Sequence, residues 1–557
     1  MTARQTTLSK PEKKALRFAS VAIAALGGGG LFFGQANPIF HCPPLVVLFP
    51  ACLAALGLLA PSDKNAFYSG WLCGIIGNSL CLYWIAVPLH YFGLVPWALT
   101  APIVMALGAF LGLYSALFTL GMRLFRARLP FPVPILLSFF LWTTLEYAKA
   151  WIFTGFPWIC LATAFVPWPV WTQMASVIGS HALSGIFAMV GVALLEAFPP
   201  RAGYTTSVPR RKKIQALGLA LLAIGSIYAH GLTVLSSPPL HGREIRVALV
   251  QGNVDQNQKW APEYQRGTVA RYLSLSESAV DPALGKVGKP VDLLIWPETA
   301  MPFYVETNTM LSERIFSFAE RYQVSLAFGA PGKNADASAG GYHNRLWFYT
   351  PASLTLLPSS PEPANTAAVY GGKGSLVHYD KNHLVPFGEY VPLSIPIPFI
   401  EYLMQGVDFR PGQDSKILHS GDIALGGLIC YEAIFPQLAR QRALDGANLL
   451  LNISNDAWFG LTSAPVQHLY LSAMRAVETG RYVVRATNTG ISAIIDQHGR
   501  ITAYGGFFKA QVVIGEAHLL AHNTVYGLTA PYIMWGTLLV AFAAVAFCFA
   551  CQRRAEP

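Results

Sequence analysis

Residues Gly426–Glu432 read GGLICYE: an apolar strand that ends in a cysteine, followed by the start of a helix that carries an acid. Functional groups of α/β proteins collect at the carboxyl ends of strands, and the amino-terminal dipole of a following helix favours a thiolate. A buried, inert thiol is the alternative interpretation of Cys430, because cysteine is commonly buried. The stretch therefore predicts a strand-to-helix junction with a candidate nucleophile.

The surrounding region, Ser236–Leu528, alternates short apolar strands with helices. Helices are expected near 262–279, 309–322, 432–445 and 464–481. Strands are expected at Ile245–Gln251, Leu293–Trp296, Leu326–Gly329, Leu346–Tyr349, Ala424–Ile429, Leu449–Ile453 and Ile491–Ile495. Such alternation predicts a layered α/β domain. Within it, Pro351–Gly374 is rich in Pro, Ser, Ala and Gly and is expected to form a surface loop.

The 557-residue chain as a whole is strongly apolar, with 53% hydrophobic and 12% charged residues. Long apolar runs lie on both sides of the α/β region. A helix needs about 20 mostly apolar residues to cross a bilayer. Runs of that kind lie near 15–34, 44–61, 67–87, 94–121, 132–154, 170–197, 214–235 and 529–551. We therefore predict three parts: a bundle of about seven membrane helices over residues 1–235, the α/β domain over 236–528, and a final helix with its tail over 529–557.

Lysine and arginine residues mark which ends of these spans face the cytoplasm. Five precede or begin the first run, three lie in Met122–Pro130 and five in Pro199–Lys213, whereas the loops around 35–43 and 88–93 have none. By the positive-inside rule the amino terminus is cytoplasmic, and seven crossings place residues 236–528 outside. Because the basic residues gather beside apolar runs, the net charge of +10 does not indicate nucleic-acid binding.

Cys430 is the only one of the eight cysteines outside the apolar runs and their flanks. It has no partner for a disulfide within its own domain. The pair Cys548 and Cys551 lies in the last apolar run, where packing is the expected role. A thiol needs a nearby base or cation to react at neutral pH.

Further acids and a lysine stand in similar positions. LLIWPE, residues 293–298, is an apolar strand that ends on Glu298, and YDKNHLVPFGE, residues 379–389, offers Lys381 and Glu389. Each alone would be typical of a surface charge, but three such positions at strand ends in one domain favour an active site. The 13 histidines are scattered without a metal-binding motif, so we expect neither a metal nor a cofactor.

In this order the three motifs resemble the nitrilase (carbon–nitrogen hydrolase) superfamily, whose site is a Glu-Lys-Cys triad in an αββα sandwich. The match extends through NISNDAWF (Asn452–Phe459) and RATNTG (Arg485–Gly490). With membrane helices on both sides, the whole chain resembles the apolipoprotein N-acyltransferases of the Gram-negative bacterial inner membrane. Pro351–Gly374 is the part that does not fit the family pattern.

The resemblance implies a role for each motif. Glu298 would be the general base and Cys430 the nucleophile, which takes an acyl chain from a phospholipid, typically phosphatidylethanolamine, as a thioester. Lys381 would stabilise the oxyanion, and Glu389 would hold Lys381. The α-amine of a diacylglyceryl-modified apolipoprotein would then accept the acyl chain, with the catalytic domain in the periplasm.

Four further residues fall on pocket positions of the family. Trp260 and Asn344 would contact substrate, and Tyr431 and Glu432 would shape the site. Core packing is the alternative for Trp260, because tryptophan commonly packs in cores.

Two other functions share parts of this pattern. A membrane-anchored nitrilase-type amidase would use the same triad, but one anchoring helix would suffice. A transporter or channel with an accessory domain would carry ionisable residues within its spans. Glu146, near Lys149, is a candidate, but charge within the spans is otherwise sparse. We therefore expect the acyltransferase.

The segment Leu384–Phe409 is apolar but is interrupted by four prolines. It can therefore neither cross the bilayer nor form one long helix. We expect it to lie at the outer membrane surface beside the Lys381–Glu389 segment, with an ordinary buried loop as the alternative.

Overall fold

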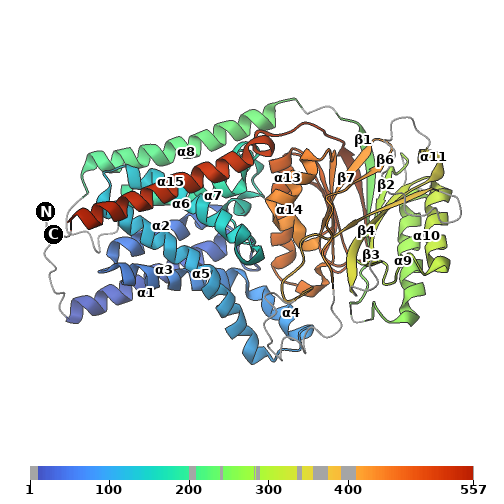
Figure 1. The fold of residues 1–557 in the computed structure, drawn as a ribbon, viewed down its shortest axis with the longest axis horizontal. Coiled ribbons are helices and arrows are strands. Elements are labelled where there is room, and N and C mark those ends of the chain that lie inside the picture. The colour runs from blue at the N-terminus through green and yellow to red at the C-terminus, as the bar shows by residue number, and fades with distance from the viewer. Residues whose placement is uncertain are drawn as a thin grey trace.

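The computed structural model describes residues 10–199, 208–238, 242–256, 258–281, 283, 289–334, 341–355, 374–390 and 409–555. A helical bundle and an α/β domain lie end to end (Figure 1). Helix α1 begins, and helix α15 ends, at the end of the bundle that is remote from the α/β domain (Figure 1).

Every apolar run predicted from the sequence corresponds to a helix of the bundle. The helices are α1 (Lys10–Gly34), α2 (Leu48–Leu59), α3 (Asp63–Cys81), α4 (Ala86–Tyr91), α5 (Trp97–Arg128), α6 (Val133–Trp151), α7 (Ala175–Ala197), α8 (Arg210–Ser236) and α15 (Val525–Ala555). Within the described residues, five helices are long and apolar enough to cross a membrane, and the bent pair of α3 with Tyr83–Tyr91 would make six. Helices α2 and α6 do not meet that criterion of length and composition.

The α/β domain contains, among its described residues, two six-stranded sheets with the orders β12-β1-β2-β3-β4-β5 and β11-β10-β9-β8-β7-β6. The first six strands are β1 (Glu244–Gln251), β2 (Leu293–Ile295), β3 (Ser325–Lys333), β4 (Tyr342–Thr350), β5 (Ser375–Asp380) and β6 (Ile417–Ser420). The others are β7 (Ile423–Ile429), β8 (Leu449–Ser454), β9 (Val483–Thr487), β10 (Ala493–Ile495), β11 (Ile501–Tyr504) and β12 (Gln511–His518). Parallel pairs β1–β2–β3 and β7–β8–β9 form the two sheet centres, and the outer pairs are antiparallel.

The sheets stack face to face between two layers of helices. Helices α9 (Pro262–Val280) and α10 (Thr309–Tyr322) lie outside the first sheet, and α13 (Pro436–Leu444) and α14 (Ala464–Thr479) lie between the second sheet and the bundle (Figure 1). Apolar side chains of both sheets, such as Ile295 and Leu451, fill the space between them. The predicted fold, an αββα sandwich carried by a membrane bundle, is confirmed. Strands β5, β6, β9, β11 and β12 were not predicted.

Two consecutive glycines explain how β7 fits at the centre of these layers. A Cβ on Gly427 would lie 2.9 Å from side-chain atoms of Leu346 and Tyr379 on the opposite sheet. A Cβ on Gly426 would lie 2.8 Å from Cβ of Arg442 on α13. Both separations are too short for real side chains, so the GG pair lets the strand pack closely on both faces.

Two loops predicted from the sequence, Pro351–Gly374 and Leu384–Phe409, lie largely outside the described residues. The chain of Pro351–Gly374 is described at its two ends, through Thr355 and again from Gly374. That of Leu384–Phe409 is described through Tyr390 and again from Phe409.

Candidate active site

Cys430 follows β7 directly and is the first residue of a short 3-10 helix, Cys430–Ile434. Its backbone φ is +50°, in the left-handed region that non-glycine residues seldom adopt. The carbonyl oxygen of Cys430 lies 3.0 Å from Nε2 of His468 and accepts a 3.4 Å hydrogen bond from Nδ2 of Asn452. The nucleophile candidate is thus held on a sharp turn at the carboxyl end of a buried strand.

Three charged side chains meet in one buried cluster beside this turn. Glu298 follows β2, Lys381 follows β5, and Glu389 lies eight residues beyond the lysine. Nζ of Lys381 lies 2.9 Å and 2.8 Å from the two carboxylate oxygens of Glu389 and 3.8 Å from Oε1 of Glu298. Because β2 and β5 belong to one sheet and β7 to the other, stacking of the sheets brings these groups toward Cys430.

Asn344 on β4 connects the two carboxylates. Its Nδ2 donates to Oε1 of Glu298 at 2.6 Å and to Oε1 of Glu389 at 3.1 Å. The backbone N–H of Asn455 donates to the other oxygen of Glu298 at 2.8 Å. These donors orient the Glu298 carboxylate and favour its charged form. Asn344, expected to contact substrate, therefore lies where it fixes the acidic groups.

Burial and the neighbouring charges together set the resting charge of each group in the cluster. Burial raises the pKa of Glu298, although the charge of Lys381 opposes the shift. Burial and the charge of Glu298 raise the pKa of the Cys430 thiol, and Lys381 again opposes them. Burial alone would lower the pKa of Lys381, but the carboxylates of Glu389 and Glu298 raise it above its usual value. The resting site therefore combines a neutral thiol, a carboxylate of increased basicity and a charged lysine.

Glu432 is fully buried and accepts four hydrogen bonds. Its Oε1 accepts from the hydroxyl of Tyr379 at 2.7 Å and from the backbone N–H groups of Asn382 at 2.8 Å and His383 at 3.0 Å. Its Oε2 accepts from the N–H of Ile429 at 2.7 Å. Glu432 thereby connects the segment that carries Lys381 to the end of β7.

The two remaining predicted residues lie at the margin of this arrangement. The hydroxyl of Tyr431 donates to the carbonyl oxygen of Gly155, in the bundle, at 3.0 Å. The side chain of Trp260 is half exposed, and none of the described hydrogen bonds of the acidic cluster comes from it. Its neighbour Lys259, for which the sequence carried no signal, reaches the turn that bears Glu298.

A second network of buried polar groups lies next to the turn at Cys430, which we call the nucleophile turn after its candidate role. Asp456 pairs with Nη2 of Arg485 at 2.7 Å and accepts from the hydroxyl of Ser454 at 2.7 Å. Nδ1 of His468 lies 3.4 Å from the same carboxylate. Burial would raise the pKa of Asp456, but the Arg485 guanidinium, assisted by His468 and Ser454, holds it below its usual range. Asp456 and Arg485 lie in matched motifs, but only the folded chain reveals their pairing.

The bundle contacts this network directly. Oε1 of Gln467, on α14, accepts from the indole N–H groups of Trp84 at 3.1 Å and Trp158 at 2.8 Å. Its Nε2 donates to the carbonyl oxygen of Ala36 at 2.9 Å. The ring of Trp158 also lies 5.4 Å from that of His468, between centroids. A bundle side chain thus packs on the residue that contacts the carbonyl oxygen of Cys430.

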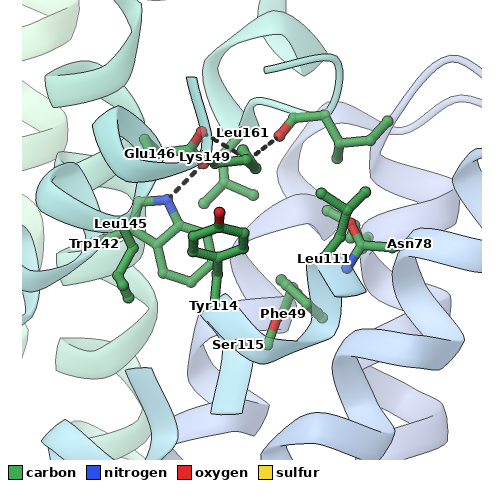
Figure 2. Close-up of a pocket in the computed structure, with 12 residues that line it drawn as sticks. Phe49, Asn78, Leu111, Tyr114, Ser115, Trp142, Leu145, Glu146, Lys149 and Leu161 are labelled. Atoms are coloured by element: carbon green, nitrogen blue, oxygen red, sulfur yellow. Dashed lines mark hydrogen bonds and ion pairs between the residues drawn. The ribbon is translucent and has the colours of Figure 1, made fainter. Parts of the chain in front are cut away.

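Figure 2 shows a cavity inside the bundle where Glu146 and Lys149 form an ion pair, with Nζ and Oε2 2.8 Å apart. Glu146 also accepts from the indole of Trp142 at 3.1 Å, and Lys149 donates to the carbonyl oxygen of Ile159 at 2.6 Å. The cavity volume is about 40 Å³, enough for about one water molecule. The pair therefore fastens α6 to the segment that contains Trp158, a structural role for the residues considered under the transporter alternative.

One group of potential metal ligands occurs among the described residues. Atoms of Glu146, Cys160 and His181 that could ligate a metal lie within 4.8 Å of one another. The sequence did not predict this group, because its members are distant along the chain. Glu146 already pairs with Lys149, and Sγ of Cys160 lies 3.0 Å from the hydroxyl of Ser184. The group shares no residue with the cluster beside the nucleophile turn.

Solved structures that resemble the chain include an amidase from Nesterenkonia sp. and a carbon-nitrogen hydrolase from Helicobacter pylori. The first is 19% identical and covers 51% of this chain and 95% of that one, with a TM-score of 0.34. The second is 17% identical and covers 54% and 95%, also with a TM-score of 0.34.

Family models and relatives cover both parts of the molecule. The carbon-nitrogen hydrolase model matches residues 246–520, and the model of the apolipoprotein N-acyltransferase N-terminal domain matches residues 28–193. Among relatives, the apolipoprotein N-acyltransferase of Geobacter metallireducens is 34% identical over 98% of each chain. That of Azotobacter vinelandii is 33% identical over 92% of this chain and 91% of its own. Similarity of this extent, over bundle and α/β domain together, shows that the chain belongs to the apolipoprotein N-acyltransferase family.

Proposed function

We propose that this protein transfers an acyl chain from a phospholipid, with phosphatidylethanolamine as the expected donor, to the α-amine of the diacylglyceryl-cysteine of bacterial apolipoproteins. One observation carries the proposal: the nucleophile turn lies between the charged cluster and the bundle. Tyr431 bonds the carbonyl oxygen of Gly155, and His468 packs on Trp158. A lipid ester could thus reach Cys430 from the membrane side while its carbonyl meets the charged cluster.

In the first half of the reaction, Glu298 takes the proton of the Cys430 thiol, and the sulfur attacks the carbonyl carbon of the lipid ester. Lys381, fixed by Glu389, donates to the oxyanion of the tetrahedral intermediate; losing such a donor typically costs about 3–4 kcal/mol. The carbon–oxygen bond then breaks, Glu298 returns the proton to the departing alkoxide, and a lyso-phospholipid leaves. The acyl chain remains on sulfur as a thioester.

In the second half, the uncharged α-amine of the apolipoprotein attacks the thioester carbonyl. Glu298 accepts a proton from the attacking nitrogen, Lys381 again stabilises the oxyanion, and the carbon–sulfur bond breaks. The proton held by Glu298 passes to the departing thiolate and restores the resting Cys430 thiol. A thioester is attacked readily by an amine, whereas the amide product is stable.

We place residues 1–235 and 529–557 in the bacterial inner membrane and residues 236–528 on its periplasmic side. Lysines and arginines near the amino terminus and in Pro199–Lys213 support this orientation. It also agrees with the start of α1 and the end of α15 at the end of the bundle remote from the α/β domain (Figure 1).

The test supplies detergent-purified, full-length protein with a phospholipid labelled in its acyl chains and a peptide that begins with diacylglyceryl-cysteine. We expect label on the amine of the peptide and none on an otherwise identical peptide whose amine is acetylated. The matched assay for the amidase alternative supplies a small aliphatic amide and measures ammonia. Release of ammonia without any transfer to the peptide would favour the amidase and overturn the proposal.

A further inference from the structure

Lys259 is a buried lysine that the proposed chemistry does not use. Only 1% of the residue is exposed. Its Nζ donates to the hydroxyl of Thr299 at 2.7 Å and to the backbone carbonyl oxygen of Glu298 at 3.4 Å. Thr299 has a φ of +47°, so these hydrogen bonds hold an unfavourable turn at the base candidate. None of the ion pairs found among the described residues includes Lys259.

The formal charges of the buried cluster show what Lys259 supplies. Glu298 and Glu389, both ionised, carry two negative charges, and Lys381 supplies one positive charge. The sum is one uncompensated negative charge among buried side chains, and Lys259 brings it to zero. A buried site with an uncompensated charge usually changes its protonation instead of retaining that charge.

We propose that Lys259 is a positioning residue for the reaction described above: its charge keeps the buried site neutral while Glu298 is a carboxylate, and its hydrogen bonds fix the Glu298 turn. This role rests on the proposed function only in that Glu298 is taken as the base for Cys430. The sequence alone does not indicate this role. In the structure Lys259 lies just before α9, next to the half-exposed Trp260.

Without Lys259, the compensating proton would fall on Glu298 and not on Glu389. Both oxygens of Glu389 lie within 2.9 Å of Nζ of Lys381, and one of them also accepts from the N–H of Val385 at 2.8 Å. Glu298 lies farther from Lys381, at 3.8 Å, and burial already raises its pKa. A protonated Glu298 could not accept the thiol proton.

Lys259 gains or loses its charge near neutral pH. Burial lowers the pKa of Lys259 to about 7, although the charge of Glu298 opposes the shift. Lys259 is therefore charged below about pH 7 and loses its charge above it. Below that pH the charge of Lys259, like that of Lys381, opposes the burial that raises the pKa of Glu298.

The test measures how fast iodoacetamide alkylates Cys430 in the full-length protein across a pH series, with no lipid present. Because the probe is neutral and soluble, the result does not depend on acyl transfer. The rate of alkylation should decrease at low pH as Glu298 takes up a proton, and we call this part of the profile the acid limb. In Glu298→Gln the acid limb should vanish, which identifies it as belonging to Glu298. Lys259→Met removes the charge and keeps the length of the side chain. Lys259→Arg retains the charge, and Thr299→Val removes one acceptor without altering any charge.

We expect Lys259→Met to move the acid limb upward by about one to two pH units, from Coulomb interaction at an effective dielectric of ~20. Lys259→Arg should keep the limb within about 0.5 unit of the unsubstituted protein. Thr299→Val should lower the plateau and leave the limb in place. An unmoved limb in Lys259→Met, at an unchanged thermal midpoint, would overturn the proposal, and so would an equal shift in Thr299→Val. Failed acyl transfer with the expected limb shifts would instead refute only the proposed function.

Discussion

Replacing Glu432 with glutamine tests whether the acid beside the nucleophile positions the lysine segment. The carboxylate accepts from Tyr379, from the N–H groups of Asn382 and His383, and from the N–H of Ile429. An amide presents one acceptor oxygen and one NH₂ donor. Whichever way it is turned, at least one of these four donors must face another donor.

The magnitude follows from the number and kind of these contacts. A hydrogen bond to a charged acceptor contributes about 1.5–3 kcal/mol, and an unpaired buried donor costs about 1–3 kcal/mol. Losing the contact with Ile429 alone therefore costs roughly 3 kcal/mol, which corresponds to a decrease of up to about 100-fold in the population of the correctly placed lysine segment. Tyr379→Phe is the matched control, because it removes one of the four donors and should decrease the rate by at most about tenfold.

The assay measures the initial rate of Cys430 acylation by a labelled phospholipid, together with the thermal midpoint of each variant. We expect Glu432→Gln to slow acylation by about 30- to 100-fold and Tyr379→Phe by less, with both variants folded at the assay temperature. A Glu432→Gln variant that acylates within twofold of the unsubstituted protein would show that these hydrogen bonds do not place the lysine.

Three further outcomes follow from the site. Glu298→Gln should prevent thioester formation itself, since no base remains; a thioester that forms normally but fails to transfer would point to another base. Because burial raises the pKa of Glu298, thiol alkylation should rise with pH through a midpoint above the ordinary 4.5, and a midpoint at or below that value would contradict the burial argument. Asp456→Asn should leave Arg485 as an unpaired buried charge, costing about 3–5 kcal/mol and lowering the thermal midpoint by on the order of 10 °C. Since the pKa of Asp456 is lowered in the folded protein, the stabilisation that its carboxylate gives is complete above pH 3.8 and disappears as the pH falls through the folded-state pKa. A thermal midpoint unaffected by Asp456→Asn would show that Asp456 does not stabilise the fold through Arg485.

The sequence predicted the strands that contain an uninterrupted stretch of apolar residues and missed those whose apolar stretch is interrupted by charge or that lie at an edge. Strand β7 is buried on both faces and reads as one apolar run. Strand β9 reads VVRAT, and its Arg485 is fully buried because Asp456, which follows the neighbouring strand β8, neutralises it. Strand β5 is the last strand of its sheet and is only partly buried, so its SLVHYD pattern gives no continuous apolar signal.

The residues of the candidate site also divide into those that could be proposed from the sequence and those that could not. Glu298 and Cys430 could be proposed because each follows a predicted strand, where α/β proteins gather functional groups. Lys381 could be proposed from its motif, YDKNHLVPFGE, although β5 before it was not predicted. Lys259 and His468 could not, because neither follows a strand in the sequence. The burial of Lys259 and the contact of His468 with the nucleophile turn arise only when distant segments pack together.

The most direct test of the account asks which atom carries the acyl chain between donor and acceptor. Full-length protein is incubated with a phospholipid labelled in its acyl chains, without acceptor, and the modified peptide is identified by mass spectrometry. We expect one labelled site, Cys430, from which hydroxylamine releases the label and from which an added diacylglyceryl-cysteine peptide removes it. Cys430→Ala and Cys430→Ser should carry no label and transfer none. Label on another residue, or normal acylation of the peptide by Cys430→Ala, would contradict the account.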